Sequence, residues 1–372
     1  MKITILKEKL KEGVNVVEKI SQKILALPIL QNILIEIEDS FLKLTTTNLE
    51  SAITWWGLVK VEKPGKICIP IKFFSSFLSL LPKKPINIES KELILNITCE
   101  NYDTKIKGFN SEDFPIIPQI PNNEYITIDN ITFCQSLNQI IGIPSPSMAR
   151  PEISGIFFSF QDKFLKLVAT DSFRLAERKI FFPNNFPKEY SFILPQTAGR
   201  EIINIFGEKE GDLRVYFSSN QVFFEFLMPE VSHPQIRFTS RLLEGEYPNY
   251  QEIIPKKYET SLLVPKEEFL NQIKTASLFS AKSSEIKLKI SSKKVEIISQ
   301  NPDLGDYKSE LGGKIKGKEI EVSFNHRFLI DGVSEINSNE LIFELTDQEG
   351  PAILKPTNKD DYFYLIMPIK TN

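Results

Sequence analysis

The chain has 372 residues, of which 41% are hydrophobic and 25% are charged, and its formal net charge is −3. This length suits two or three domains of ordinary size, and the composition is typical of a globular protein. A slightly acidic chain is not expected to bind nucleic acid through overall basicity. The three cysteines are scattered and odd in number, which argues against a disulfide framework and indicates a reducing compartment.

The N-terminal residues Met1 to Ile5 lack the apolar core of a signal peptide, and no apolar run is long enough to cross a bilayer. We therefore expect a cytoplasmic protein with no membrane partner.

An apolar stripe with helical spacing recurs six times along the chain. Its members lie at i, i+3, i+4 and i+7, the spacing of one buried helix face, so each stripe predicts an amphipathic helix. The six helices are expected at residues 8–20, 71–82, 131–142, 195–206, 265–279 and 325–336. A unit of roughly 60–70 residues is longer than most solenoid repeats, but it is still an internal repeat.

The segments between the helices read as strands, and every second unit shares further detail. Polar breaks at 39–40, 161–163 and 291–293 predict a hairpin after the first helix of each of three domains. In the second half of the last domain, Leu341–Thr346 is expected to accompany Tyr362–Met367. Proline-rich segments at 114–123 and 247–257 predict stiff linkers. The predicted domains are residues 1–122, 123–256 and 257–372.

The predicted fold is α+β, with three tandem domains that each pack two helices on antiparallel sheets. Three such domains do not readily close a sheet by themselves. Two copies of the chain would supply six domains, and head-to-tail pairing would close a ring and satisfy the edge strands.

The chain offers no convincing catalytic constellation. Its two histidines, His233 and His326, have no metal-ligand partner at a suitable spacing, and no Gly-x-Ser-x-Gly motif is present. Residues 312–318 match the first seven positions of a phosphate-binding loop, but Glu319 stands where that motif needs a hydroxyl. We therefore predict no catalytic residue, no metal ligand and no cofactor. A nucleotide-binding enzyme that uses 312–318 stays open as an alternative.

Charge is placed unevenly between the predicted helices and the rest of the chain. Residues 7–23, 72–84, 131–142, 196–206, 266–282 and 326–336 hold 13 Lys+Arg and 8 Asp+Glu, a net charge of +5 that leaves −8 for the remainder. Ordinary solvated lysines on helix surfaces explain such a bias. A channel lined by the helices explains it as well, since weak attraction to phosphates permits sliding.

Several stretches, in this order and at matching distances, resemble the bacterial sliding clamp family, the beta subunits of DNA polymerase III. They are Leu27-Pro28-Ile29-Leu30, Asp113-Phe114-Pro115, Leu167 to Ala176, Ser240 to Tyr250, Phe324-Asn325 and Tyr364 to Lys370. The resemblance covers the whole chain. It implies three tandem clamp domains, a ring-shaped head-to-tail homodimer and a processivity factor that encircles duplex DNA without catalytic activity of its own.

The resemblance also implies an apolar pocket for short linear peptides of partner proteins. The matching positions are Ile153, Thr170, Ser172, Phe173, Arg174, Leu175, Pro248, Ile253, Pro351, Leu365, Ile366, Met367, Pro368 and Ile369. Apolar walls would accept apolar side chains, while Arg174 and backbone groups would fix the orientation of the peptide. The chain has Ser172-Phe173-Arg174 where the family often has Gly-His-Arg, and Ile369-Lys370 where the family often has Met-Arg. These departures leave the peptide preference open.

Basic residues of the helices and of one loop are expected to face DNA. They are Lys7, Lys11, Lys23, Lys72, Arg150, Arg200 and Lys274; for Lys23 and Arg150 the expectation comes from the resemblance. The resemblance further points to Thr104 and Ile106 at one end of the dimer interface, and to Leu278 and Phe279 at the other.

The partners implied are double-stranded DNA, the DNA polymerase III catalytic subunit, the clamp loader, other proteins with clamp-binding motifs and a second copy of the chain. The expected location is the cytoplasm, in association with the nucleoid. A repeat-built scaffold that never meets DNA stays open as a further alternative.

Overall fold

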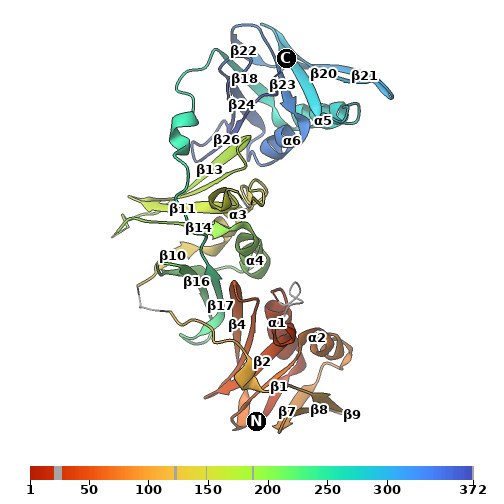
Figure 1. Ribbon diagram of the computed structural model, residues 1–372, viewed down its shortest axis with the longest axis vertical. Coiled ribbons are helices and arrows are strands. Elements are labelled where there is room, and N and C mark those ends of the chain that lie inside the picture. Colours follow the sequence, from red (N-terminus) through yellow and green to blue (C-terminus); the bar gives the residue numbers. More distant parts are fainter. Residues whose placement is uncertain (21–26, 121–123, 148, 187, 371–372) are drawn as a thin grey trace. The chain divides into compact units, whose positions relative to one another are not determined.

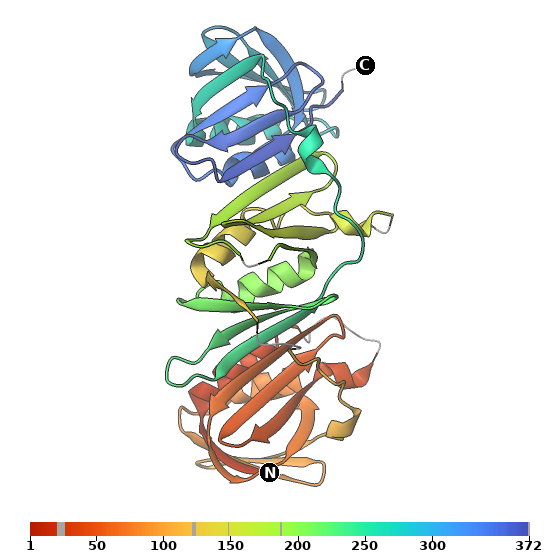
Figure 2. The ribbon, with the colours of Figure 1, turned by 90° about the vertical axis from the view of Figure 1, so that its left-hand side faces the viewer.

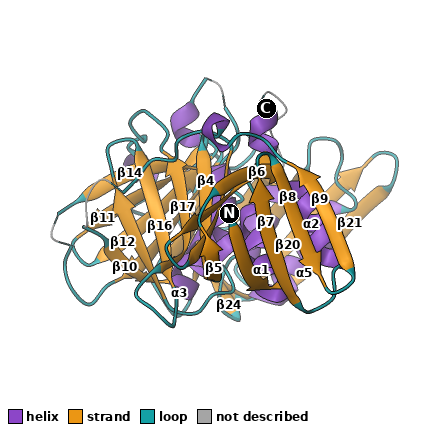
Figure 3. Ribbon diagram, turned by 90° about the horizontal axis from the view of Figure 1, so that it is seen from below, coloured by secondary structure: helices purple, strands orange, loops and turns teal. Residues whose placement is uncertain are grey.

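The computed structural model describes residues 1–20, 27–120, 124–147, 149–186 and 188–370. Within them the chain forms six α-helices and 26 strands, and Figure 3 shows how strongly strands predominate. The chain divides into two compact units. Unit 1 comprises Met1–Gln135 and Thr197–Leu242, and unit 2 comprises Ser136–Gln196 and Leu243–Asn372.

The helices confirm the six predicted apolar stripes. They are α1 (Lys7–Val17), α2 (Ile71–Leu80), α3 (Asn130–Asn138), α4 (Gln196–Phe206), α5 (Lys266–Ser277) and α6 (His326–Ser334), labelled in Figure 1. In α1, for example, Leu10, Val14 and Val17 are fully buried. Each helix follows a strand directly, and side-chain caps mark two of the starts. Asn325 Oδ1 accepts a hydrogen bond from Arg327 N at 3.0 Å, and Asp129 Oδ2 accepts one from Thr132 N at 2.8 Å.

Unit 1 contains two antiparallel sheets. The first has the order β5 (Lys60–Lys63), β1 (Lys2–Leu6), β7 (Pro85–Lys91), β8 (Ile94–Cys99), β9 (Tyr102–Lys107). The second has the order β10 (Ile126–Asp129), β15 (Asp212–Phe217), β16 (Gln221–Leu227), β17 (Pro234–Arg241), β4 (Ser51–Leu58), β3 (Phe41–Thr47), β2 (Asn32–Glu38), β6 (Lys66–Pro70). Strands far apart in sequence therefore share one sheet, because β4 pairs with β17 from Ser51↔Ser240 to Trp55↔Ile236. Figure 2 shows this junction as red-orange strands beside a green one.

Unit 2 repeats this organisation. Its larger sheet has the order β14 (Tyr190–Pro195), β11 (Gly155–Gln161), β12 (Phe164–Thr170), β13 (Arg174–Phe181), β26 (Tyr362–Ile366), β25 (Ala352–Pro356), β24 (Glu340–Leu345), β18 (Thr260–Pro265), β22 (Lys314–Gly317). Its smaller sheet has the order β21 (Gly305–Gly312), β20 (Lys294–Asn301), β19 (Glu285–Ile290), β23 (Ile320–Asn325). Here β13 pairs with β26, from Arg174↔Ile366 to Arg178↔Tyr362.

The helices bury their apolar faces on these sheets. In unit 1, α1 packs on β3 and β4, and Phe133 of α3 and Phe206 of α4 stack or tilt against Phe224 and Phe226 of β16. In unit 2, α5 packs on β18 to β21 and α6 on β23 and β26.

The three predicted hairpins form as β2–β3, β11–β12 and β19–β20. Asp39 and Asp162 take a positive φ in two of these turns, which aspartate tolerates better than most residues.

One prediction about strands was wrong, and the alternative of a phosphate-binding loop has no support. The segments 341–346 and 362–367 are not direct neighbours, because the additional strand β25 pairs with both β24 and β26. Residues 312–318 do not form a phosphate-binding loop. Lys314–Gly317 is strand β22, paired with β18, and the next element is strand β23 rather than a helix. Without a helix N-terminus to face a phosphate, nucleotide binding at this segment has no structural basis.

Candidate functional site

The sequence-predicted peptide site lies around the turn that joins β12 to β13 in unit 2. Asp171 Oδ1 accepts hydrogen bonds from the backbone N–H groups of Phe173 and Arg174, both at 3.0 Å. The Thr170 hydroxyl donates to Arg174 O at 2.7 Å and accepts from Ser172 N at 3.2 Å. These bonds fix the turn and leave Phe173 62% exposed. The exposed ring stacks on Phe328, with 6.4 Å between the ring centroids.

Ser172 takes the left-handed backbone conformation in this turn, with φ = +78°. A residue with a Cβ pays about 1–2 kcal/mol for that conformation, whereas glycine does not. Glycine also loses more chain entropy on folding, which removes part of the gain. We predict that Ser172→Gly raises the free energy of unfolding by about 0.5–1 kcal/mol, measured by urea denaturation. Ser147→Gly is the matched control, and a Ser172→Gly variant that is less stable than the parent would contradict the prediction.

The Arg174 guanidinium is buried and fully engaged within the chain. It contacts Asp171 at 2.8 Å and Asp331 at 2.5 Å, donates to Gly142 O at 3.3 Å, and lies 4.4 Å from the centroid of the Phe328 ring. Burial alone lowers the pKa of this guanidinium, but Tyr364 and the two carboxylates outweigh burial and raise it. Arg174 therefore stays charged and holds the turn against α6, where Phe328 and Asp331 lie.

An apolar cluster lies directly beside this turn. Its buried members come from β12, β13, β25 and β26, joined by one tyrosine of the linker: Val168, Leu175, Ile353, Leu365 and Tyr250. Partly buried residues pack against it: Phe157, Tyr247, Ile254, Tyr258, Phe363 and Met367. Met367 N donates to Phe173 O at 2.9 Å, which extends the β13–β26 pairing up to the turn. The cluster, the turn and Met367 thus form one continuous surface, which we call the β13–β26 surface.

Two tyrosines of the predicted linker anchor it to this cluster. Tyr250 donates to Glu177 Oε2 at 2.5 Å, and Tyr247 donates to Val168 O at 3.4 Å and stacks on Phe157 at 4.8 Å. Burial is the main cause of the raised pKa of both phenols, and the Glu177 carboxylate raises the pKa of Tyr250 further. Both phenols therefore stay protonated. The linker is a packed part of the surface rather than a simple connector.

The structure brings most of the predicted pocket residues together on this surface. Thr170 to Leu175 form the turn, and Leu365 to Met367 lie opposite them. Ile153 is buried in a short 3-10 helix, Ile253 is 51% exposed at the end of another, and Ile369 N donates to Ser323 O on β23. Pro248 and Pro351 are half-buried and Pro368 is buried. Whether these residues bind a peptide stays a prediction.

Sequence reasoning missed several members of the surface. Tyr247 and Tyr250 lie in a stretch that carries the family resemblance, and Pro248 between them was a predicted pocket residue, but the two tyrosines themselves were assigned only to the linker 247–257. Phe328 and Asp331 gave no usable signal, because the ion pair to Arg174 spans 157 residues of sequence.

The predicted DNA-facing residues fall into three groups. Lys72, Arg150, Arg200 and Lys274 are exposed and Lys11 is partly exposed, while Lys23 lies outside the described residues. Lys7 was wrongly placed, because it is only 6% exposed. It lies three residues before Leu10, on the buried face of α1. Arg150 donates to Ser172 Oγ at 3.3 Å, next to the β13–β26 surface.

The predicted dimer residues lie at two sheet edges. Thr104 and Ile106 belong to β9, which ends the smaller sheet of unit 1, and Ile106 is buried within the chain. Leu278 caps α5 and is 70% exposed, and Phe279 stacks on Tyr307 of β21 at 5.6 Å. Strand β21 ends the smaller sheet of unit 2.

Among residues 1–20, 27–120, 124–147, 149–186 and 188–370, no group of three or more His, Cys, Asp or Glu side chains is arranged to hold a metal ion. None of the helices in these ranges is long and apolar enough to span a membrane.

Comparison with known proteins covers nearly the whole chain. Family models match three successive segments: the N-terminal domain of the DNA polymerase III beta subunit at residues 1–118, its central domain at 127–249 and its C-terminal domain at 251–370. A beta sliding clamp from Staphylococcus aureus is 30% identical over 357 residues, 93% of each chain, and one from Staphylococcus epidermidis is 29% identical over the same length. The crystal structure of the DNA polymerase sliding clamp from Bacillus subtilis matches all of both chains, with a TM-score of 0.94 and 26% identity.

Proposed function

The chain belongs to the DNA polymerase III beta subunit family, the beta sliding clamps, and from this premise we propose how its surfaces serve that role. As a member of the family it is a processivity factor of DNA replication and has no catalytic activity of its own. Two copies assemble head to tail into a ring, and the ring encircles duplex DNA in the cytoplasm, at the nucleoid. The domain boundaries at 122 and 256 belong to this proposal.

Two complementary strand edges are the observation that supports ring closure. Strand β9 carries Asp103, Lys105 and Lys107, a net charge of +1, whereas β21 carries Asp306, Lys308 and Glu310, a net charge of −1. Each strand ends its sheet and so presents unpaired backbone groups, which another strand can satisfy. Exposed apolar side chains lie at both edges: Ile94 of β8 and Tyr102 of β9 at one, Leu278 of the α5 cap and Leu304 before β21 at the other. Pairing β9 of one chain with β21 of the other would cover both sets.

Inside the ring, weak electrostatic contacts would suffice to hold the protein near DNA. The exposed basic side chains of Lys72, Arg200 and Lys274 lie on α2, α4 and α5, so that each third of the chain contributes one of them. A few dispersed cations attract phosphates without reading the sequence. A closed ring needs little affinity, since its topology prevents escape.

The ring should stay on circular DNA and leave linear DNA. We expect the chain, loaded by a clamp loader and ATP onto a nicked plasmid, to co-elute with the plasmid in gel filtration. Cutting the plasmid with a restriction enzyme should release most of the protein, because a sliding ring runs off a free end. Uncut plasmid treated with heat-inactivated enzyme is the control. Equal retention on circular and linear DNA would indicate ordinary binding and would contradict the proposal, as would failure to remain on the circle.

The β13–β26 surface would bind short apolar segments of the polymerase catalytic subunit, the clamp loader and other clamp-binding proteins. Tethering a partner in this way raises its effective concentration at the DNA, so that rebinding becomes intramolecular. The support comes from the exposed Phe173, the half-buried Met367 and the apolar cluster between them.

We predict that Met367→Ala weakens binding of a fluorescein-labelled hexapeptide of alternating leucine and serine that ends in phenylalanine. Loss of most of a thioether side chain from the contact should cost about 1–2 kcal/mol, or about tenfold in Kd. Fluorescence anisotropy gives the affinity. Phe181→Ala, which removes a larger exposed apolar side chain from the far end of β13, is the matched control. Equal affinities for the parent and Met367→Ala would place the peptide elsewhere.

A further inference from the structure

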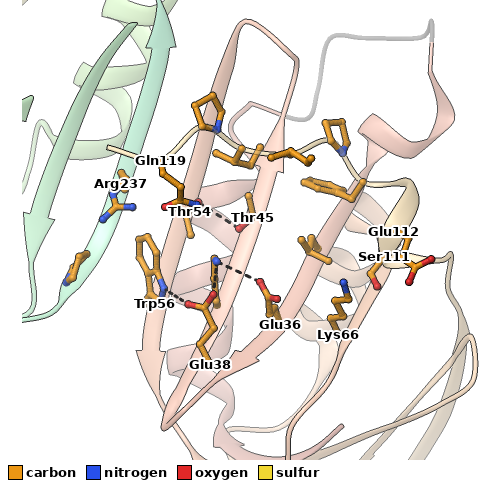
Figure 4. Close-up of a pocket in the computed structure, with 18 of the residues that line it drawn as sticks. Glu36, Glu38, Thr45, Thr54, Trp56, Lys66, Ser111, Glu112, Gln119 and Arg237 are labelled. Carbon is orange, nitrogen blue, oxygen red and sulfur yellow. Dashed lines mark hydrogen bonds and ion pairs between the residues drawn. The ribbon is translucent and has the colours of Figure 1, made fainter. Parts of the chain in front are cut away.

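A cleft of about 590 Å³ lies over the larger sheet of unit 1. Its floor is the face of β2, β3, β4 and β17 on which Leu34, Thr45, Thr54 and Arg237 form one cross-strand row. Residues 114–119 line the other side, and Figure 4 shows this segment crossing above the strands. We call residues 114–119 the strap. Nothing in the proposed function uses this cleft.

The cleft occupies the position in unit 1 that the β13–β26 surface occupies in unit 2. Strand β3 reads FLKLTTT and β12 reads FLKLVAT, and the turn that follows each strand has the same hydrogen bonds. Asn48 Oδ1 accepts from the N–H groups of Glu50 and Ser51, as Asp171 Oδ1 does from Phe173 and Arg174. Leu49 has φ = +72°, matching +78° at Ser172.

The strand pairing beyond the turn matches as well. Arg241 N donates to Glu50 O at 2.8 Å, and Met367 N donates to Phe173 O at 2.9 Å. A linker with an aromatic-proline pair crosses each site, Phe114-Pro115 in unit 1 and Tyr247-Pro248 in unit 2. The two sites therefore share the same local architecture. The inference drawn from this similarity rests on the peptide-binding role proposed for unit 2.

Several side chains at equivalent positions are polar in unit 1 and apolar in unit 2. The registers place Thr45 where unit 2 has Val168, and Thr239 where it has Leu365. They also place Arg237 where unit 2 has Phe363, and Arg241 stands where Met367 does. Thr45 is hydrogen-bonded to Thr54 and Arg237 to Glu225, but an all-apolar ligand would still remove water from these polar groups without replacing its hydrogen bonds, which is costly. The cleft calls for a ligand that brings polar groups of its own.

The charges on the floor favour a cation. Glu36 and Glu38 share a single ammonium, since Lys43 Nζ lies 3.3 Å from one carboxylate and 2.6 Å from the other. Arg237 is neutralised by Glu225, at 2.7 and 3.0 Å. Lys66, which pairs with Glu36 in the β2–β6 ladder, is offset by Glu112, so the cleft as a whole keeps one negative charge. Trp56 Nε1 lies 3.5 Å from Glu38 Oε2, and Figure 4 shows Trp56, Glu36, Glu38 and Lys66 on the floor. A basic side chain of a ligand would balance the negative charge.

The strap offers apolar contacts and backbone groups. Ile116 is 96% exposed, although it lies among Pro115, Ile117 and Pro118. Within the described part of the chain, the backbone N–H groups of Ile116, Ile117 and Gln119 make no hydrogen bond to another backbone group. An extended peptide can satisfy such groups by lying alongside as an added strand. Its side chains would then point alternately toward the floor and away from it, the latter beside the exposed side chain of Ile116.

We propose that this cleft is a second peptide-binding site, which takes an extended segment in which apolar and basic side chains alternate. The apolar side chains pack beside Ile116 of the strap, on the face turned away from the floor. The basic side chains lie over Glu36 and Glu38, and the peptide backbone pairs with the strap.

The two tryptophans of the chain make a direct test possible. Both lie on β4, but Trp56 lines the cleft, while Trp55 points to the opposite face and is fully buried. The full-length protein, labelled with ¹⁵N-tryptophan, is titrated with the probe Ac-Val-Lys-Val-Lys-Val-Lys-NH2. We expect a saturable shift of the Trp56 indole signal and little shift of the Trp55 signal. The acidic probe Ac-Val-Glu-Val-Glu-Val-Glu-NH2 should bind at least about tenfold more weakly.

Two surface variants locate the site without disturbing the core. Ile116→Asp and Glu36→Lys should each weaken the basic probe by about tenfold, whereas the matched controls Phe181→Asp and Glu8→Lys should not. The proposal is overturned if Trp56 does not shift, if both probes shift it equally, or if the two cleft variants bind like their controls. Unit 2 contains no tryptophan, so this readout is independent of whether the β13–β26 surface binds its own peptide.

Discussion

Leu278→Asp should convert the dimer into a monomer at micromolar concentration. The leucine side chain is 70% exposed in the single chain and lies beside the edge that β21 presents. Burial of a leucine contributes about 2 kcal/mol, and a buried unpaired carboxylate costs more. A ring of two chains closes through two identical interfaces, so the dimer loses the binding free energy of this leucine at both of them. A penalty of about 4 kcal/mol raises the dimer dissociation constant by about a thousandfold.

Light scattering coupled to gel filtration measures this directly. The parent should give about twice the chain mass of 42.7 kDa, and Leu278→Asp should give the chain mass itself. Phe181→Asp introduces the same charge at another exposed apolar position and should remain dimeric. A monomeric parent would contradict the ring, and a dimeric Leu278→Asp variant would move the interface away from β21.

Arg174→Ala should lower the free energy of unfolding by about 3–5 kcal/mol, the cost of breaking a buried ion pair from one side. The substitution leaves Asp171 without its cation, although Asp171 is only 9% exposed, and it removes the guanidinium from the Phe328 ring. Chemical denaturation measures the change, and the apolar hexapeptide should also bind more weakly, because the turn that presents Phe173 loses its anchor.

Asp331→Asn tests whether burial of the ion pair, rather than the loss of any charge near Arg174, explains the loss of stability expected for Arg174→Ala. Asp331 pairs with the same guanidinium, but its side chain is 56% exposed, and an exposed pair contributes about 1 kcal/mol or less. We expect a small loss of stability for Asp331→Asn. If the two variants are destabilised equally, burial is not what makes the Arg174 contacts strong.

The helices were predictable because each carries a strict apolar stripe, and the same logic produced the error at Lys7. A lysine was assumed to lie on a solvated face, yet its position three residues before Leu10 places it on the buried one. Strand β25 was missed because its five residues follow Gly350-Pro351 and precede a polar turn, so that nothing distinguished it from a loop.

The candidate site was predictable only where it is local in sequence. The turn from Thr170 to Leu175 and the strand from Leu365 to Met367 were found through resemblance, and their mutual pairing could not have been read from either segment alone. Asp331 and Tyr250 became visible only in the folded chain, since their partners are 157 and 73 residues away.

The two strand pairings that bridge distant parts of the sequence also have a mechanical consequence. β4 with β17 and β13 with β26 each continue a sheet over five residue pairs, so bending at either junction would break several backbone hydrogen bonds at once. A proposed contact of β9 with β21 rests on one strand from each chain and has no covalent connection. If the ring must open to admit DNA, we expect it to open at the contacts between the two chains, while the strand pairings within each chain stay intact.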